Sequence, residues 1–198
     1  MKKNQPYKLL SIIFLLLVTN VANASISLGF GESIQTGSTV NIDVTISGLG
    51  IEVAPSLYDY SIDISFDSSH LSFSEASFGD SVLGNQLDLF DLGNDSGALV
   101  KDVDLLNIYE FSFDEVTDLN DYQADSFTLA TLSFNILQYG NSQLSFIGYD
   151  LGDTNLDEFG IGNLLTATLG TGTVSTVPVP AAFWLMASGL GLLYRQKK

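Results

Sequence analysis

Residues 58–66 are Tyr-Asp-Tyr-Ser-Ile-Asp-Ile-Ser-Phe, with a large apolar or aromatic side chain at every second position. Residues 40–47, Val-Asn-Ile-Asp-Val-Thr-Ile-Ser, show the same alternation. Because successive side chains of a β-strand point to opposite faces, a period of two predicts strands with one buried and one exposed face. The two tyrosines of the apolar row, Tyr58 and Tyr60, are therefore expected in the core.

Similar strand patterns recur along the middle of the chain, between turns rich in Gly, Asn, Asp and Ser. They lie at residues 71–73, 105–113, 130–136, 144–146 and 164–174. A short helical pattern is present only at residues 116–122. The pattern as a whole predicts an all-β fold, an antiparallel β-sandwich of about nine strands with one core between two sheets.

Charge divides the chain into a basic start, an acidic middle and a basic end. All 23 acidic residues lie between Glu32 and Glu158, and residues 25–176 contain one basic residue, Lys101. This middle part therefore has a net charge of −22, against −16 for the whole chain. Such a domain repels nucleic acids and anionic lipid headgroups, which excludes nucleic-acid binding. Because the chain has no cysteine, disulfides, thiol nucleophiles and cysteine metal sites are excluded as well.

Residues 1–24 have the three parts of a secretory signal peptide. A start with three lysines precedes an apolar run at residues 9–18, and Ala22 and Ala24 are the small residues of a signal-peptidase site. The run of about ten residues is too short to cross a bilayer, which takes ~20. We expect an N-terminal signal helix that signal peptidase removes after Ala24.

Residues 177–198 form a second apolar segment that ends in positive charge. Residues 181–194 would make a helix of ~21 Å, and snorkelling basic side chains would help it to match a ~30 Å hydrocarbon core. The basic end stays on the cytoplasmic side of a membrane. We therefore expect a short transmembrane helix with the domain outside. The motif before this helix is Val177, Pro178, Val179, Pro180, Ala181 and Ala182, and the basic residues after it are Arg195, Lys197 and Lys198.

This segment resembles the PEP-CTERM sorting signal, in which a proline motif, an apolar stretch and a basic terminus follow one another. The family motif is often Val-Pro-Glu-Pro, and Val179 stands here in place of the glutamate. The resemblance implies recognition by an exosortase, a membrane protease or transpeptidase, with residues 177–198 as its substrate. It also implies a Gram-negative protein that passes the inner membrane and reaches the cell surface or an extracellular biofilm matrix.

The middle of the chain resembles cohesin domains. The resemblance rests on residues 36–40, 60–67, 71–73, 125–134 and 151–153, in this order. It implies a jelly-roll-like β-sandwich over residues 25–176, related to certain carbohydrate-binding modules. Cohesins bind dockerin modules through one flat sheet face. The resemblance therefore implies a non-catalytic adhesion or scaffolding module with a dockerin-like protein as partner.

Two other functions remain open for this domain. A polysaccharide-binding module would use exposed aromatic rings, and residues 25–176 contain no tryptophan. The tyrosines available for such stacking are Tyr58, Tyr60, Tyr109, Tyr122, Tyr139 and Tyr149. An acidic matrix protein without a specific ligand is the third alternative.

Residues for catalysis or metal binding are few. His70 is the single histidine, and no Gly-x-Ser-x-Gly motif accompanies it, so we expect no enzyme and no cofactor. Asp153, Asn155 and Asp157 match the first ligands of a calcium loop, but Glu158 and Leu164 stand where Gly and Glu are required. These three residues leave open calcium binding or an ordinary polar turn.

Overall fold

The computed structural model describes residues 25–50 and 55–178. The predicted signal peptide with Ala22 and Ala24 lies outside the described residues, as do Val179 to Ala182, Arg195, Lys197 and Lys198. The described residues form eleven strands and one helix. No helix within them is long and apolar enough to span a bilayer.

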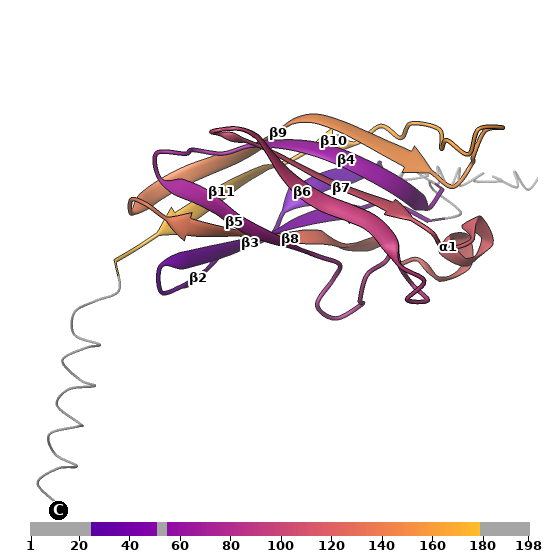
Figure 1. The fold of residues 1–198 in the computed structure, drawn as a ribbon, viewed down its shortest axis with the longest axis horizontal. Coiled ribbons are helices and arrows are strands. Elements are labelled where there is room, and N and C mark those ends of the chain that lie inside the picture. The colour runs from indigo at the N-terminus through magenta and orange to yellow at the C-terminus, as the bar shows by residue number, and fades with distance from the viewer. Residues whose placement is uncertain (1–24, 51–54, 179–198) are drawn as a thin grey trace, which may run out of the picture.

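The strands form two sheets that run along the long axis of the molecule (Figure 1). The first has the order β10-β1-β3-β8-β5, with β2 also paired to β3. Its pairs are antiparallel except for β1 with β10, which is parallel. Its strands are β1 (Ser27–Phe30), β2 (Ile34–Thr36), β3 (Thr39–Ser47), β5 (Leu71–Phe78), β8 (Ser126–Ile136) and β10 (Thr168–Leu169).

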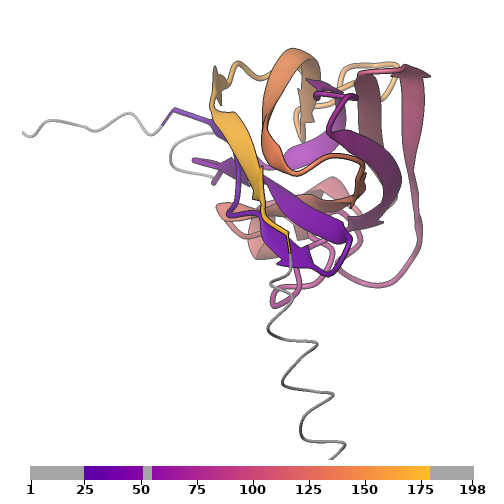
Figure 2. The ribbon, with the colours of Figure 1, turned by 90° about the vertical axis from the view of Figure 1, so that its left-hand side faces the viewer.

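The second sheet has the order β11-β9-β4-β7-β6 and is antiparallel throughout. Helix α1 (Val116–Tyr122) follows β7 at one end of the sandwich, at the right in Figure 1. Figure 2 shows the opposite end, where β11 leads the chain out of the domain. The strands are β4 (Leu57–Ser65), β6 (Asn94–Asp102), β7 (Leu105–Ser112), β9 (Gly140–Asp153) and β11 (Thr171–Thr176).

The core lies between the sheets and consists of their inward rows. Residues of β3 and β4 alternate between buried and partly exposed, as the sequence predicts. Phe134 of β8 is fully buried and touches Phe66 and Phe73 with its ring. Burial of each such side chain contributes about 1.5–3 kcal/mol, so the paired rows account for most of the stability of the sandwich.

The prediction of Tyr58 in the core was wrong, whereas that of Tyr60 is confirmed. Tyr60 is 2% exposed, but Tyr58 is only half-buried. A bulge in the pairing with β9 between Leu57 and Asp59 breaks the alternation at Tyr58. Its ring instead packs against the exposed Phe111, at 4.9 Å between centroids.

Candidate binding face

The long strands of the first sheet have a polar outer surface. Strands β3, β5 and β8, all within the described residues, expose no large hydrophobic side chain, whereas Ile34 of the short β2 and Leu169 of the short β10 are exposed. The carboxylate of Asp43 accepts a 2.6 Å hydrogen bond from Thr131, so even the acidic group there is partnered within the sheet. This surface offers little apolar area to a partner. Its outward side chains include Asn41, Asp43, Thr45, Thr131 and Ser133.

The outer surface of the second sheet exposes large apolar and aromatic side chains beside polar ones. Tyr109 and Phe111 of β7 are each 36% exposed, and Leu99 of β6 is 58% exposed. Ile147 is 59% exposed on β9, which β4 separates from β7, at the point where the pairing of β9 with β4 is irregular. We call this surface the binding face; it comprises Ser61, Asp63, Leu99, Tyr109, Phe111 and Ile147.

Strand register sets the position of Tyr109 on this face. Tyr109 pairs with Ser61 on one side and with Gly97 on the other. A Cβ added to Gly97 would stand 2.7 Å from the phenol oxygen and 2.9 Å from two ring carbons. The tyrosine ring therefore lies across Gly97, close to the sheet, because glycine leaves that space free.

Lys101 neutralises one carboxylate of the binding face. Its ammonium group lies 2.6 Å from Asp63, which also accepts a 2.8 Å hydrogen bond from Asn107. Asn107 in turn donates to the hydroxyl of Ser61. The hydrogen bond from Lys101 is the main cause that lowers the pKa of Asp63. The face thus combines an ordered polar centre with aromatic rings.

The end of the face near α1 is more strongly acidic. Burial and the charges of Asp150 and Asp153 raise the pKa of Asp59. Asp59 also lies against Gly152, where an added Cβ would collide with its carboxylate. A cationic group of a partner would be attracted to this end.

Asp153 and Asn155 meet in the structure, whereas Asp157 organises a separate turn. One oxygen of Asp153 accepts the amides of Asn155 and Asn163, at 2.8 and 2.9 Å. Asp157 accepts the amides of Phe159 and Ile161. No group of three His, Cys, Asp or Glu side chains in residues 25–50 and 55–178 is placed to hold a metal ion. Calcium binding at Asp153, Asn155 and Asp157 stays a prediction.

His70 lies in the turn before β5, beside a serine and an aspartate. Its Nδ1 is 2.8 Å from Asp67 and 3.0 Å from the hydroxyl of Ser69. A hydrolase triad needs the serine and the aspartate on opposite ring nitrogens. Here both lie at the same nitrogen, while Nε2 faces Gly140. The group stabilises a turn and lacks the geometry of a triad.

Of the six tyrosines considered for sugar stacking, Tyr109 belongs to the binding face and Tyr58 packs against Phe111 at its border. Tyr60 is buried, and the hydroxyl of Tyr149 is held by the backbone of Ala167. Tyr122 and Tyr139 are exposed at α1 and in the turn between β8 and β9. The structure therefore does not bring these rings together into one platform.

A small pocket of mixed polarity opens at the edge of the sandwich between β5 and β6. Its volume of about 200 Å³ is below the ~300–1,000 Å³ of typical small-molecule sites. It lacks titratable side chains in its lining, which consists of Phe66, Ser68, Leu71, Ser72, Phe73, Val100, Val103 and Leu137. This pocket gives no support to catalysis.

No protein-family model matches the chain, and no curated protein matches it. Solved structures do match. The sixth cohesin of scaffoldin B from Acetivibrio cellulolyticus, solved with a dockerin, is 19% identical, with a TM-score of 0.57 over 77% of this chain and 99% of that chain. The domain has the cohesin fold. A type I cohesin–dockerin complex from Clostridium thermocellum gives 14% identity, a TM-score of 0.56, and coverage of 77% and 99%.

The cohesin fold also occurs in a module of a family 33 glycoside hydrolase from Clostridium perfringens. That module is 12% identical, with a TM-score of 0.54 over 76% of this chain and 94% of that chain. The expected cohesin-like sandwich is thus confirmed as a fold. At these identities the likeness concerns the fold alone, and the binding face rests on its own side chains. The sequence did not locate this face, because β6 has no alternating pattern.

Proposed function

We propose that this chain is an exported, non-catalytic module that binds a protein partner through the binding face. The observation that supports this most directly is the difference between the two sheets. Large apolar side chains are exposed on the long strands β6, β7 and β9 of one sheet, whereas the long strands β3, β5 and β8 of the other sheet expose none. Exposed apolar side chains grouped on one side of a domain mark interaction surfaces.

A dockerin-like module is the partner that we propose. Two of the similar cohesins were solved in complexes with dockerins. Tyr109 and Phe111 would form the apolar centre of the contact, because tyrosine and other large aromatic side chains commonly carry binding energy. The acidic charge of the domain favours a partner with a basic surface and speeds the encounter with it.

Titration of the full-length chain against a panel of dockerin modules tests this proposal. Replacement of both rings, Tyr109→Ala with Phe111→Ala, should weaken binding at least tenfold. The matched control is Asn41→Ala with Thr45→Ala on the opposite sheet, which should change binding less than twofold. If the control variant lost as much affinity as the ring variant, or if no dockerin bound, the proposed partner or face would be wrong. Thermal melting of each variant confirms that it is folded.

A polysaccharide is the alternative ligand, and the position of Tyr109 favours it. The ring lies close to the sheet across Gly97, as a ring that stacks on a sugar would. Glycans titrated in the same assay separate the two ligands. Binding of an exopolysaccharide, lost in Tyr109→Ala and without any dockerin binding, would favour the sugar.

The two ends of the chain provide export and sorting in this proposal. Signal peptidase would cut after Ala24, and an exosortase would process the tail after transient insertion in the inner membrane. The protein would then act at the cell surface or in the extracellular matrix. Mass spectrometry of the mature protein should find Ser25 as the first residue and the tail after Pro180 removed. Intact ends on a surface-exposed protein would contradict this processing.

A further inference from the structure

A second group of exposed apolar side chains lies at the end of the sandwich that carries α1. The chain crosses from β5 to β6 there, through residues 79–93. Tyr122 is 65% exposed, and its ring meets the exposed Phe90 edge to face, with 6.0 Å between centroids. Leu92 is also exposed, two residues after Phe90, whereas the exposed Phe113 packs its ring against Phe111 of the binding face. We call Phe90, Leu92 and Tyr122 the end surface.

The crossover is tied down on both sides of Phe90. The amide of Leu89 donates to the buried carboxylate of Asp114, and the amide of Gly93 donates to Asp88 at 3.0 Å. Asp91 at the tip has a φ of 54°, in the left-handed region that a non-glycine residue rarely adopts. These bonds fix the backbone that carries Phe90 and Leu92.

The same crossover is also attached to the segment after α1. Gln123 donates to the carbonyl of Gln86 at 2.9 Å, and the side chain of Gln86 accepts the amide of Ala124 at 2.8 Å. Leu87 between these contacts is 1% exposed and anchors the segment in the core. The pair of Phe90 and Tyr122 is thus held from two elements that are distant in sequence, and its exposure is built into the fold.

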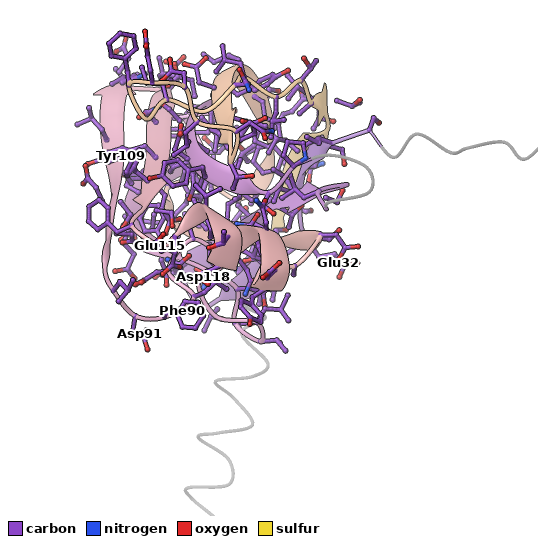
Figure 3. All side chains as sticks on the ribbon, turned by 90° about the vertical axis from the view of Figure 1, so that its right-hand side faces the viewer. Glu32, Phe90, Asp91, Tyr109, Glu115 and Asp118 are labelled. Atoms are coloured by element: carbon purple, nitrogen blue, oxygen red, sulfur yellow. The ribbon has the colours of Figure 1, made fainter. Side chains whose placement is uncertain are left out.

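Carboxylates surround the end surface. Figure 3 shows Asp91, Glu115 and Asp118 on the same side of the molecule as Phe90. The ion pairs within the described residues are His70 with Asp67 and Lys101 with Asp63, and neither involves these three carboxylates. Residues 25–176 contain no other lysine or arginine than Lys101. The negative charge at this end therefore has no cationic partner in the domain.

Aromatic rings beside carboxylates match the chemistry of arginine and lysine side chains. A guanidinium or ammonium group stacks on a ring and pairs with a carboxylate, while its aliphatic stem packs on apolar surface. Polyanions and a second copy of this acidic domain are repelled. We propose that the end surface binds an arginine- or lysine-rich segment of another protein. With the binding face, the module would then bridge two partners, a role that goes beyond the proposed function.

Octa-arginine labelled with fluorescein is the probe, and its anisotropy with the full-length chain in 0.15 M NaCl is the measurement. Phe90→Ser with Tyr122→Ser should weaken binding at least fivefold. The control, Ile34→Ser with Tyr139→Ser, removes two exposed apolar side chains outside the end surface. It should change the affinity for octa-arginine less than twofold. All these proteins have the same charge, so general attraction to the domain is equal. Equal affinities of the two variants would show attachment by overall charge and overturn the proposal.

A second pair of variants tests the carboxylates. Asp91→Asn with Asp118→Asn should weaken octa-arginine binding at least fivefold, and Glu75→Gln with Asp104→Asn should do so less than twofold. Both variants remove two charges, so only position distinguishes them. An equal loss in the two variants would again overturn the proposal. Dockerin binding at the binding face should be unchanged in all four variants. If the octa-arginine results contradict the proposal for the end surface, the proposed dockerin binding at the binding face is therefore not affected.

Discussion

Tyr60 on β4 donates a hydrogen bond of 3.0 Å to Glu110 on β7, and both side chains are buried. The other carboxylate oxygen of Glu110 accepts the side-chain amides of Asn85 and Asn94. These residues come from the crossover and from the start of β6. A buried carboxylate with three donors thus joins the core to the segment that carries the end surface.

Glu110→Gln should fold, and its stability should lack the pH dependence that the carboxyl of Glu110 gives the wild type. Burial is the main cause that raises the pKa of Glu110. Because the folded-state pKa lies above the unfolded value, wild type loses stability as pH rises from about 4.5 through the raised pKa. The glutamine does not titrate. The unfolding free energy of the variant should therefore rise relative to that of the wild type over that range and then level off. Urea unfolding from pH 4 to 8 measures it.

Glu110→Ala serves as the counterpart to this variant. Glutamine can still accept from Asn85 and Asn94 and donate to Tyr60, so its stability at pH 7 should lie within about 1 kcal/mol of wild type. Alanine leaves these donors without an acceptor and should cost about 3 kcal/mol. A glutamine variant as unstable as the alanine variant would show that the negative charge itself is required.

Salt should stabilise the full-length chain. The domain repels itself through its unbalanced carboxylates, and this repulsion is screened within about 8 Å at 0.15 M salt. We expect the Tm to rise by several degrees between 0.05 and 1 M NaCl. Choline chloride should act equally, because ionic strength and not a specific cation is the cause. A Tm that falls with either salt would contradict the explanation.

The regular strands and the helix were predictable because their patterns are strong. The helix over residues 116–122 is confirmed, and β3 and β4 contain the predicted alternating runs. Strand β1 with its glycine, the three-residue β2 and the edge strand β6 were missed, since none of them alternates clearly. Part of the prediction for residues 164–174 was wrong: strands occupy only Thr168–Leu169 and Thr171–Thr176 there. On β11 the buried positions are Gly172, Val174 and Thr176. Because only one of these has a large apolar side chain, the sequence of β11 does not alternate between apolar and polar residues.

The candidate surfaces were less predictable than the fold. Tyr109 and Phe111 follow the same alternation as other strand residues, and only the sheet order decides that they face solvent. Phe90 and Tyr122 are 32 positions apart, so their pairing depends on the crossover. The burial of Glu110 could not be predicted from the sequence either, because its hydrogen-bond donors Asn85, Asn94 and Tyr60 lie in other segments.

Asp153→Ala should destabilise the domain by about 2 kcal/mol with or without calcium. Asp153 is 4% exposed, and its carboxylate accepts the amides of Asn155 and Asn163, which would lose their acceptor. Thermal melting in 1 mM EDTA and in 1 mM CaCl₂ measures the loss. Should the loss appear only in CaCl₂, the carboxylate would act as a calcium ligand, and the predicted site would gain support. Asp157→Ala, at an exposed turn, should cost less than about 1 kcal/mol in both buffers.

Gln35 should determine how firmly Val177, the first residue of the proposed sorting motif, is held to the domain. Its side chain accepts the amide of Val177 and donates to the carbonyl of Val177, both at 2.9 Å. In Gln35→Ala the Val177 amide should exchange with solvent deuterium about ten times faster, since it loses an interaction of ~1 kcal/mol or more. Gln35→Glu keeps the acceptor for the Val177 amide but loses the donor to the Val177 carbonyl, and should retain only part of the protection. The amides of β11 serve as the internal reference, because their partners on β9 are unchanged. Equal protection of Val177 in the alanine variant would show that the strand pairing alone, and not Gln35, fixes the point at which the domain ends.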